Sequence, residues 1–136
     1  MPQDIRNLLV KKEKRLYKII FILYTLFLFT VTLMPLNVFD SGQGEWLPFL
    51  EFDNLDKVVH ALLFFVFTGI FYLALNPNKI YLFVIPVLTG LLIETLQHTL
   101  GLGRTFDPYD ILANSLGTIC MLALILFLEK RRLSQE

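Results

Sequence analysis

Long apolar runs separated by short polar segments dominate the chain. Four runs carry almost no charge, and they predict membrane-spanning helices over residues 17–38, 58–76, 79–100 and 110–129. A helix needs about 20 predominantly apolar residues to cross the hydrocarbon core of a bilayer. Because lipid offers the backbone no hydrogen-bond partners, spanning segments are restricted to helices and closed barrels. We therefore expect an all-α, four-helix transmembrane bundle that forms a single domain over residues 1–136.

The segments between the runs are rich in residues that end helices. Residues 36–57 contain glycine, proline and acidic side chains, residues 76–79 read Asn-Pro-Asn-Lys, and residues 101–110 combine glycine, proline and aspartate. Such clusters favour turns and loops. Asp107 is expected to cap the helix that follows it.

Composition supports a membrane protein and gives no indication of nucleic-acid binding. Hydrophobic residues make up 55% of the chain, charged residues only 18%, and the mean hydropathy is +0.61. Soluble domains are nearer about 45–50% apolar and a quarter charged. The formal net charge is zero, so the basic surface typical of nucleic-acid binding is not expected.

The distribution of basic residues predicts the orientation. Ten lysines and arginines fall on one side of the predicted bundle, in the N-terminal segment, the turn at residues 76–79 and the C-terminal segment. Only Lys57 and Arg104 fall on the other side. Cytoplasmic loops are enriched in basic residues, so we expect both termini to lie in the cytoplasm.

Polar residues that are costly in lipid gather at the predicted outer face of the membrane, and no comparable cluster is expected at the inner ends. Ionisable side chains within spans suggest a functional site. The candidate binding residues are Asp56, Lys57, His60, Glu94, Gln97, Arg104, Asp107, Asp110 and Asn114.

Helical spacing places these residues on common faces. Asp56 and His60 are one turn apart, and Glu94 and Gln97 continue a stripe from Gly90. Asp110 and Asn114 share a stripe with Gly117 in the same way. The glycines allow neighbouring helices to approach closely. Arg104 is expected to pair with Glu94 or Asp110, because its planar guanidinium matches a carboxylate.

The ordered set of these polar residues resembles the signature of the VanZ-like family of bacterial integral membrane proteins, which is related to the teicoplanin-resistance protein VanZ. The resemblance rests on residues 56–60 (Asp-Lys-Val-Val-His), residues 94–97 (Glu-Thr-Leu-Gln), and Arg104, Asp107, Asp110, Asn114 and Gly117, and on residues 32–35 (Thr-Leu-Met-Pro). It implies a multi-pass protein of the bacterial cytoplasmic membrane. No settled biochemical activity accompanies the family.

Three functions are consistent with these residues. We expect, first, an outward-facing pocket that binds the head group of a membrane lipid, a lipid-linked cell-envelope precursor or another amphiphile, with a link to teicoplanin susceptibility. The alternatives are an intramembrane acid/base or metal-dependent enzyme acting on a lipid-linked substrate, and a scaffold for another membrane protein. A structural network that only holds the helices together also fits.

No cofactor is expected, and no metal ligands are assigned. His60, Glu94, Asp110 and His98 offer suitable donor atoms, but no paired-ligand motif of the His-Glu-x-x-His kind occurs.

Overall fold

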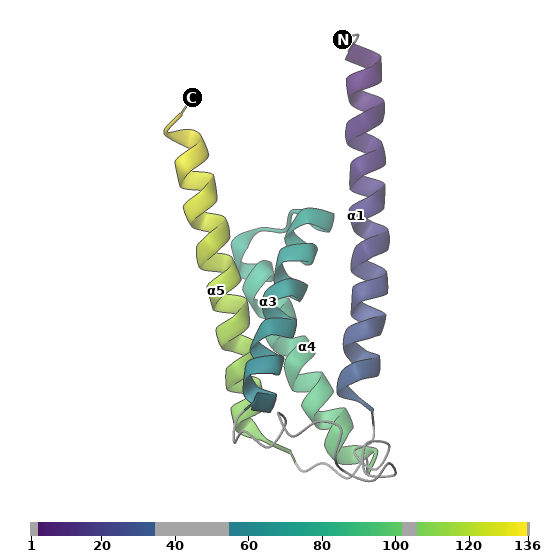
Figure 1. Cartoon of the computed structure of the whole chain (residues 1–136), viewed down its shortest axis with the longest axis vertical. Helices are drawn as coiled ribbons and strands as arrows, with labels where there is room; N and C mark the ends of the chain where they lie inside the picture. Colours follow the sequence, from purple (N-terminus) through teal and green to yellow (C-terminus); the bar gives the residue numbers. More distant parts are fainter. Residues whose placement is uncertain (1–2, 35–54, 102–105, 136) are drawn as a thin grey trace.

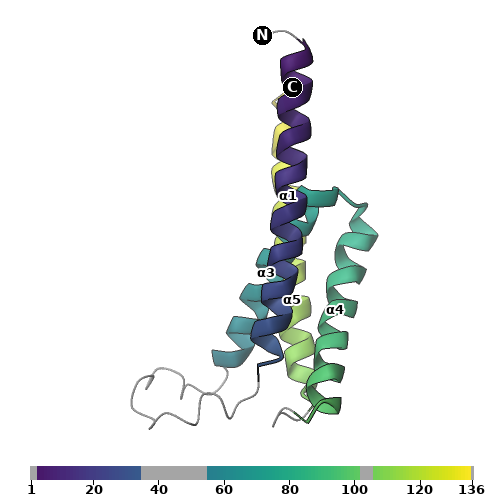
Figure 2. The ribbon, with the colours of Figure 1, turned by 90° about the vertical axis from the view of Figure 1, so that its right-hand side faces the viewer.

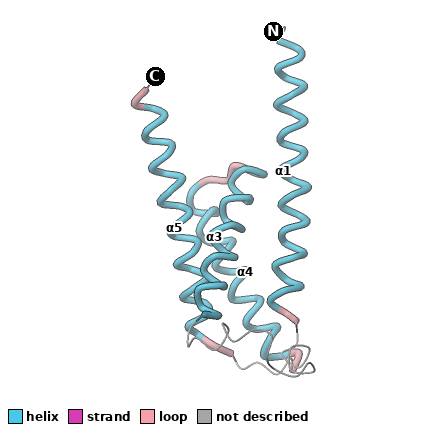
Figure 3. The backbone as a smooth tube through the Cα atoms, in the orientation of Figure 1, coloured by secondary structure: helices cyan, strands magenta, loops and turns pink. Residues whose placement is uncertain are grey.

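The computed structural model is helical throughout its regular parts and describes residues 3–34, 55–101 and 106–135. Its helices are α1 (Gln3–Thr32), α3 (Leu55–Leu75), α4 (Lys79–Thr99) and α5 (Pro108–Leu133). Figure 1 shows them side by side with both chain termini at the same end of the molecule. The tube in Figure 3 shows a short loop joining α3 to α4 at the end nearer the termini.

Within the described residues, four helices are long and apolar enough to cross a membrane, which confirms that part of the sequence prediction. The spanning stretches are Lys11–Thr32, Leu55–Leu75, Lys79–Thr99 and Pro108–Leu133. The largest difference is at the start of α1, which is helical from Gln3 rather than from residue 17. Lysine, arginine, glutamate and leucine are good helix formers, so the helix continues beyond the hydropathy limit used for the prediction.

Helix α3 makes the most extensive contacts of the described helices, chiefly with α5 and then with α1. Its closest approach is to α5, where a Cβ atom added to Gly117 would lie 2.0 Å from the backbone oxygen of Ala61. Only glycine fits at such a distance, as the sequence pattern predicted. Gly90 on α4 packs less tightly against Asn114 and Phe64. A Cβ atom added to Gly90 would lie 3.0 Å from Asn114 Nδ2, the nearest atom.

Two apolar clusters fill the space between the helices. One comprises Leu28, Phe64, Phe67 and Ile93, and the other comprises Phe71, Leu82 and Ile125. The outer surface is also apolar, with side chains such as Leu112 and Leu116 more than half exposed. An apolar surface on all sides is the pattern of helices that face lipid.

Helix α1 is the least enclosed of the four spans. The Tyr24 hydroxyl of α1 donates a hydrogen bond to the backbone oxygen of Leu63 on α3, at 3.0 Å. Figure 2 shows that α1 extends well beyond the loop between α3 and α4. Part of α1 therefore stands clear of α4 at the end that holds the termini.

Candidate functional site

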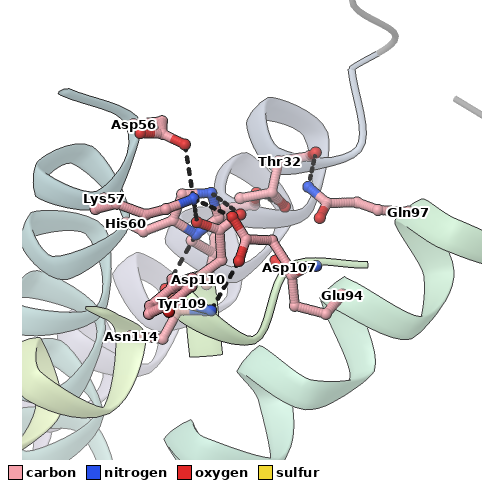
Figure 4. Close-up of polar contacts among 11 residues, drawn as sticks. Thr32, Asp56, Lys57, His60, Glu94, Gln97, Asp107, Tyr109, Asp110 and Asn114 are labelled. Carbon is pink, nitrogen blue, oxygen red and sulfur yellow. Dashed lines mark hydrogen bonds and ion pairs between the residues drawn. The ribbon is translucent and has the colours of Figure 1, made fainter. Parts of the chain in front are cut away.

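Seven polar residues meet at the end of the bundle opposite the two termini, where α3 begins, α4 ends and α5 begins (Figures 1 and 4). We call this group the carboxylate cluster. Its members are Asp56, Lys57, His60, Glu94, Asp107, Asp110 and Asn114. It contains four carboxylates and one lysine ammonium.

The start of α5 holds two of the carboxylates in place. Asp107 is the N-cap of α5, and its Oδ1 accepts a hydrogen bond from the backbone N–H of Tyr109 at 2.8 Å. Pro108 follows at the first helical position, where its missing N–H costs nothing. Asp110 then lies in the first turn and faces α3. The predicted cap is confirmed, and the cap residue also belongs to the carboxylate cluster.

Lys57 is surrounded by three carboxylates. Its Nζ donates to Asp56 Oδ2 at 2.8 Å and also to Asp107 Oδ2 and Asp110 Oδ1. The Lys57 ammonium and the Tyr109 N–H hold the pKa of Asp107 below its ordinary value. The Lys57 ammonium is therefore already paired with carboxylates of the same chain.

His60 connects α3 to two residues of α5. Its Nδ1 lies 3.1 Å from Asn114 Oδ1, and its Nε2 lies 3.8 Å from Asp110 Oδ2. Because an amide oxygen only accepts hydrogen bonds, Nδ1 carries the proton in this contact. The second distance is too long for a hydrogen bond. His60, Asp110 and Asn114 are all buried.

Glu94 is completely buried and incompletely paired. Its Oε2 accepts a hydrogen bond from the backbone N–H of Asp107 at 3.3 Å. Its Oε1 has no hydrogen-bond partner among the described residues, and the same holds for Nδ2 of Asn114. A buried polar atom without a partner costs about 1–3 kcal/mol. Each of these atoms therefore needs a partner that the described residues do not supply.

Gln97, a predicted member of the site, makes a different contact. Its Nε2 donates to the backbone oxygen of Thr32 at 2.7 Å and so ties α4 to the end of α1 (Figure 4). His98 is exposed on α4. Arg104 lies outside the described residues, and so does its predicted pairing with Glu94 or Asp110.

A second polar cluster, at the end nearer the termini, was not anticipated from the sequence. We call it the Glu129 cluster. Glu129 Oε1 accepts hydrogen bonds from Tyr72 Oη at 2.7 Å and from Lys79 Nζ at 2.5 Å. Lys79 also lies over the Tyr72 ring, 4.8 Å from its centre. The three residues are far apart along the chain, so no local spacing indicates their contact.

Two groups of side chains bring possible metal-ligand atoms close together. One comprises His60, Glu94 and Asp110, and the other Asp56, Asp107 and Asp110. Within each group the donor atoms lie within 4.8 Å of one another. His98, the fourth donor considered from the sequence, is not in either group.

Comparison with known proteins identifies the family. A protein from Schizosaccharomyces pombe, described as Uncharacterized protein C11E3.10, is 38% identical over 100 residues, which cover 70% of this chain and 61% of that protein. The sequence resemblance had implied a family of bacterial proteins, but this relative comes from a yeast. No solved structure matches. The family model described as VanZ/LLP1 matches residues 21–129, which include all seven residues of the carboxylate cluster. The chain therefore belongs to the VanZ/LLP1 family.

Proposed function

We propose that the chain binds the polar head group of a lipid-linked or otherwise amphiphilic cell-envelope molecule at the carboxylate cluster. The observation that carries the proposal is the incomplete pairing of the cluster. Glu94 is fully buried, and one of its oxygens has no partner among the described residues. A network that served only to hold helices together would satisfy its buried groups, because each unsatisfied group lowers stability.

The chemistry of the cluster favours a head group that donates hydrogen bonds. Four carboxylates face one ammonium, and Lys57 is already engaged by three of them. Amines and sugar hydroxyls are suitable partners for the remaining acceptor atoms. The apolar surface of the helices accommodates the hydrocarbon part of the molecule in the bilayer.

In this proposal both termini are cytoplasmic and the carboxylate cluster lies at the outer face of the membrane. The support is the excess of basic residues in the N-terminal and C-terminal segments and at Lys79. The location suits envelope molecules exposed on the outer leaflet, and altered teicoplanin susceptibility would be one consequence. A protease-sensitive tag on either terminus should be cut only after intact cells are opened. Cleavage in intact cells would overturn the orientation.

The binding test compares two substitutions of the same chemical type. Glu94→Gln alters the carboxylate cluster, and Glu129→Gln alters the Glu129 cluster at the other end of the bundle. Purified protein in detergent is titrated with teicoplanin and with a polyprenyl-linked peptidoglycan precursor, and binding is followed by native mass spectrometry. We expect Glu94→Gln to weaken binding at least about tenfold, the effect of losing about 1.4 kcal/mol. Glu129→Gln should bind as the unaltered chain does.

Equal binding by the unaltered chain and both variants would contradict the proposal. A loss of folded protein in Glu94→Gln alone, with no binding by the unaltered chain, would instead favour a purely structural network. Abundance in membranes and thermal stability in detergent are measured in parallel, so that the two outcomes can be separated.

A second candidate function is acid/base catalysis on a lipid-linked substrate. The observation that favours it is the buried group of His60, Glu94 and Asp110, whose donor atoms lie within 4.8 Å of one another. An imidazole and carboxylates at such distances are the usual residues of proton transfer. Conversion of the precursor that is lost in Asp110→Asn would establish this function. Binding without conversion would leave the first proposal standing alone.

A further inference from the structure

We propose that His60, Glu94 and Asp110 form a binding site for a divalent transition-metal ion. All three side chains are buried, and they come from three different helices, α3, α4 and α5. From the sequence, these residues offer suitable donor atoms, but no metal ligands are assigned because no paired-ligand motif occurs. The fold brings them together.

The distances suit a common ion. One donor atom from each residue lies within 4.8 Å of the other two. Imidazole nitrogen and carboxylate oxygen bind such ions at about 2.0–2.2 Å, so two ligands of one ion lie no more than about 4.4 Å apart. Ligands of a tetrahedral ion lie about 3.3–3.6 Å apart, so binding would draw these donor atoms together by up to about 1.5 Å.

The hydrogen bond between His60 and Asn114 prepares the imidazole for a metal. Because Asn114 Oδ1 accepts the Nδ1 proton, Nε2 presents its lone pair toward Asp110 Oδ2, 3.8 Å away. With the imidazole in this neutral tautomer, two acceptor atoms face each other, and a cation between them would bind both. Metal-ligating histidines usually donate their other ring N–H to an oxygen in this way. Asn114 is a positioning residue in this arrangement.

The charges around Lys57 provide an internal comparison. In the neighbouring group of Asp56, Asp107 and Asp110, the Lys57 ammonium lies among the carboxylates and supplies the cation. In the group of His60, Glu94 and Asp110, Lys57 contacts only Asp110, and among the described residues no lysine or arginine pairs with Glu94. The buried Glu94 Oε1 has no partner among the described residues. Burial of an uncompensated charge is costly, and a bound cation removes that cost.

One imidazole and two carboxylates favour a first-row transition ion such as Zn²⁺ or Mn²⁺ over Ca²⁺, which prefers oxygen ligands. Three protein ligands leave at least one coordination position for another molecule. If the proposed function holds, this position would allow an anionic group of the envelope amphiphile, such as a phosphate, to bind beside the carboxylates. The metal site itself does not depend on that function.

The direct experiment measures metal in protein purified without chelator and again after stripping and titration with Zn²⁺ and Mn²⁺. Elemental analysis should give about one ion per chain, and metal should raise the unfolding temperature in detergent. Asp110→Asn and Glu94→Gln should lose both effects, and Glu129→Gln should keep both. Asn114→Ala should bind about 10–100-fold more weakly. Metal-free protein that neither ion stabilises would overturn the proposal.

A second variant guards against loss by misfolding. His60→Cys replaces the imidazole with a thiol, and Co²⁺ bound there should produce a sulfur-to-cobalt absorption band that the unaltered chain lacks. A folded His60→Cys variant that binds Co²⁺ without this band would overturn the assignment of His60. These measurements use no amphiphile, so their failure is distinguishable from failure of amphiphile binding, which is measured separately.

Discussion

The two polar clusters lie at opposite ends of the bundle and are built differently. In the Glu129 cluster, one carboxylate is matched by Lys79 and Tyr72, and the Lys79 and Glu129 side chains are more than a third exposed. In the carboxylate cluster, three carboxylates surround one ammonium, and the fully buried Glu94 has one oxygen without a partner among the described residues.

The difference distinguishes a structural contact from a candidate site. In the Glu129 cluster one carboxylate faces one ammonium, and Tyr72 and Lys79 both donate to Glu129 Oε1. The carboxylate cluster has more acceptors and more negative charge than the described residues compensate. Residue type alone would have grouped the two together, since both contain acids, a lysine and a hydrogen-bonding ring.

The largest loss of stability is expected from a substitution that separates α3 from α5, the two helices whose close approach supports the carboxylate cluster. Gly117→Ala places a methyl group against the backbone of Ala61, the neighbour of His60. Because backbone cannot move aside cheaply, we expect a loss of about 3 kcal/mol in unfolding free energy. Gly69→Ala is the matched control, because its added methyl meets only the flexible end of Met121. The measurement is reversible unfolding in mixed micelles. Equal losses in both variants would show that the approach is not rigid.

A smaller effect contrasts the two lysines. Lys57→Met leaves three carboxylates close together without their ammonium, and we expect a loss of about 2 kcal/mol. Lys79→Met breaks one partly exposed ion pair and should cost less than about 1 kcal/mol. The same unfolding assay measures both. If Lys79→Met were the more damaging, the expectation that the partly exposed pair contributes less than the Lys57 pairs would be wrong.

The smallest effect is a pH dependence at Asp107. Its pKa is lowered in the folded state by Lys57 and by the Tyr109 N–H. Its contribution to stability is therefore complete above its unfolded pKa of about 4 and is lost as the pH falls through the lower folded value. We expect the stability difference between the unaltered chain and Asp107→Asn to stay constant from pH 7 to about 4.5 and to shrink below about pH 4. A difference that shrinks between pH 7 and 5 would contradict this assignment.

The helices could be predicted from the sequence because hydropathy and loop residues both mark their limits. Asp107 and Pro108 marked the start of α5, and the turn after Leu75 marked the start of α4. The early start of α1 could not be predicted in this way, because the basic segment before it is too polar to count as a span. Helix propensity, rather than hydropathy, is the signal that indicates it.

The site could be predicted only in outline. The i, i+4 spacing of Asp56 and His60 indicated a shared face, but spacing within one helix cannot say which partner a side chain meets. Gln97 was expected among the carboxylates, yet it contacts the backbone of α1. Glu129 and Tyr72 meet across 57 positions of the chain. Such contacts depend on how the helices are rotated about their axes relative to one another. The composition of each helix does not determine that rotation.

The attachment of α1 has a consequence for evolution. Among the described residues, two side-chain hydrogen bonds join α1 to other helices, from Tyr24 to the oxygen of Leu63 and from Gln97 to the oxygen of Thr32, and backbone atoms accept both. Every amino acid supplies that oxygen, so positions 63 and 32 can vary without any compensating change at the donors. Methods that infer neighbouring helices from correlated substitutions among relatives should therefore detect α1 weakly, even where it packs as described.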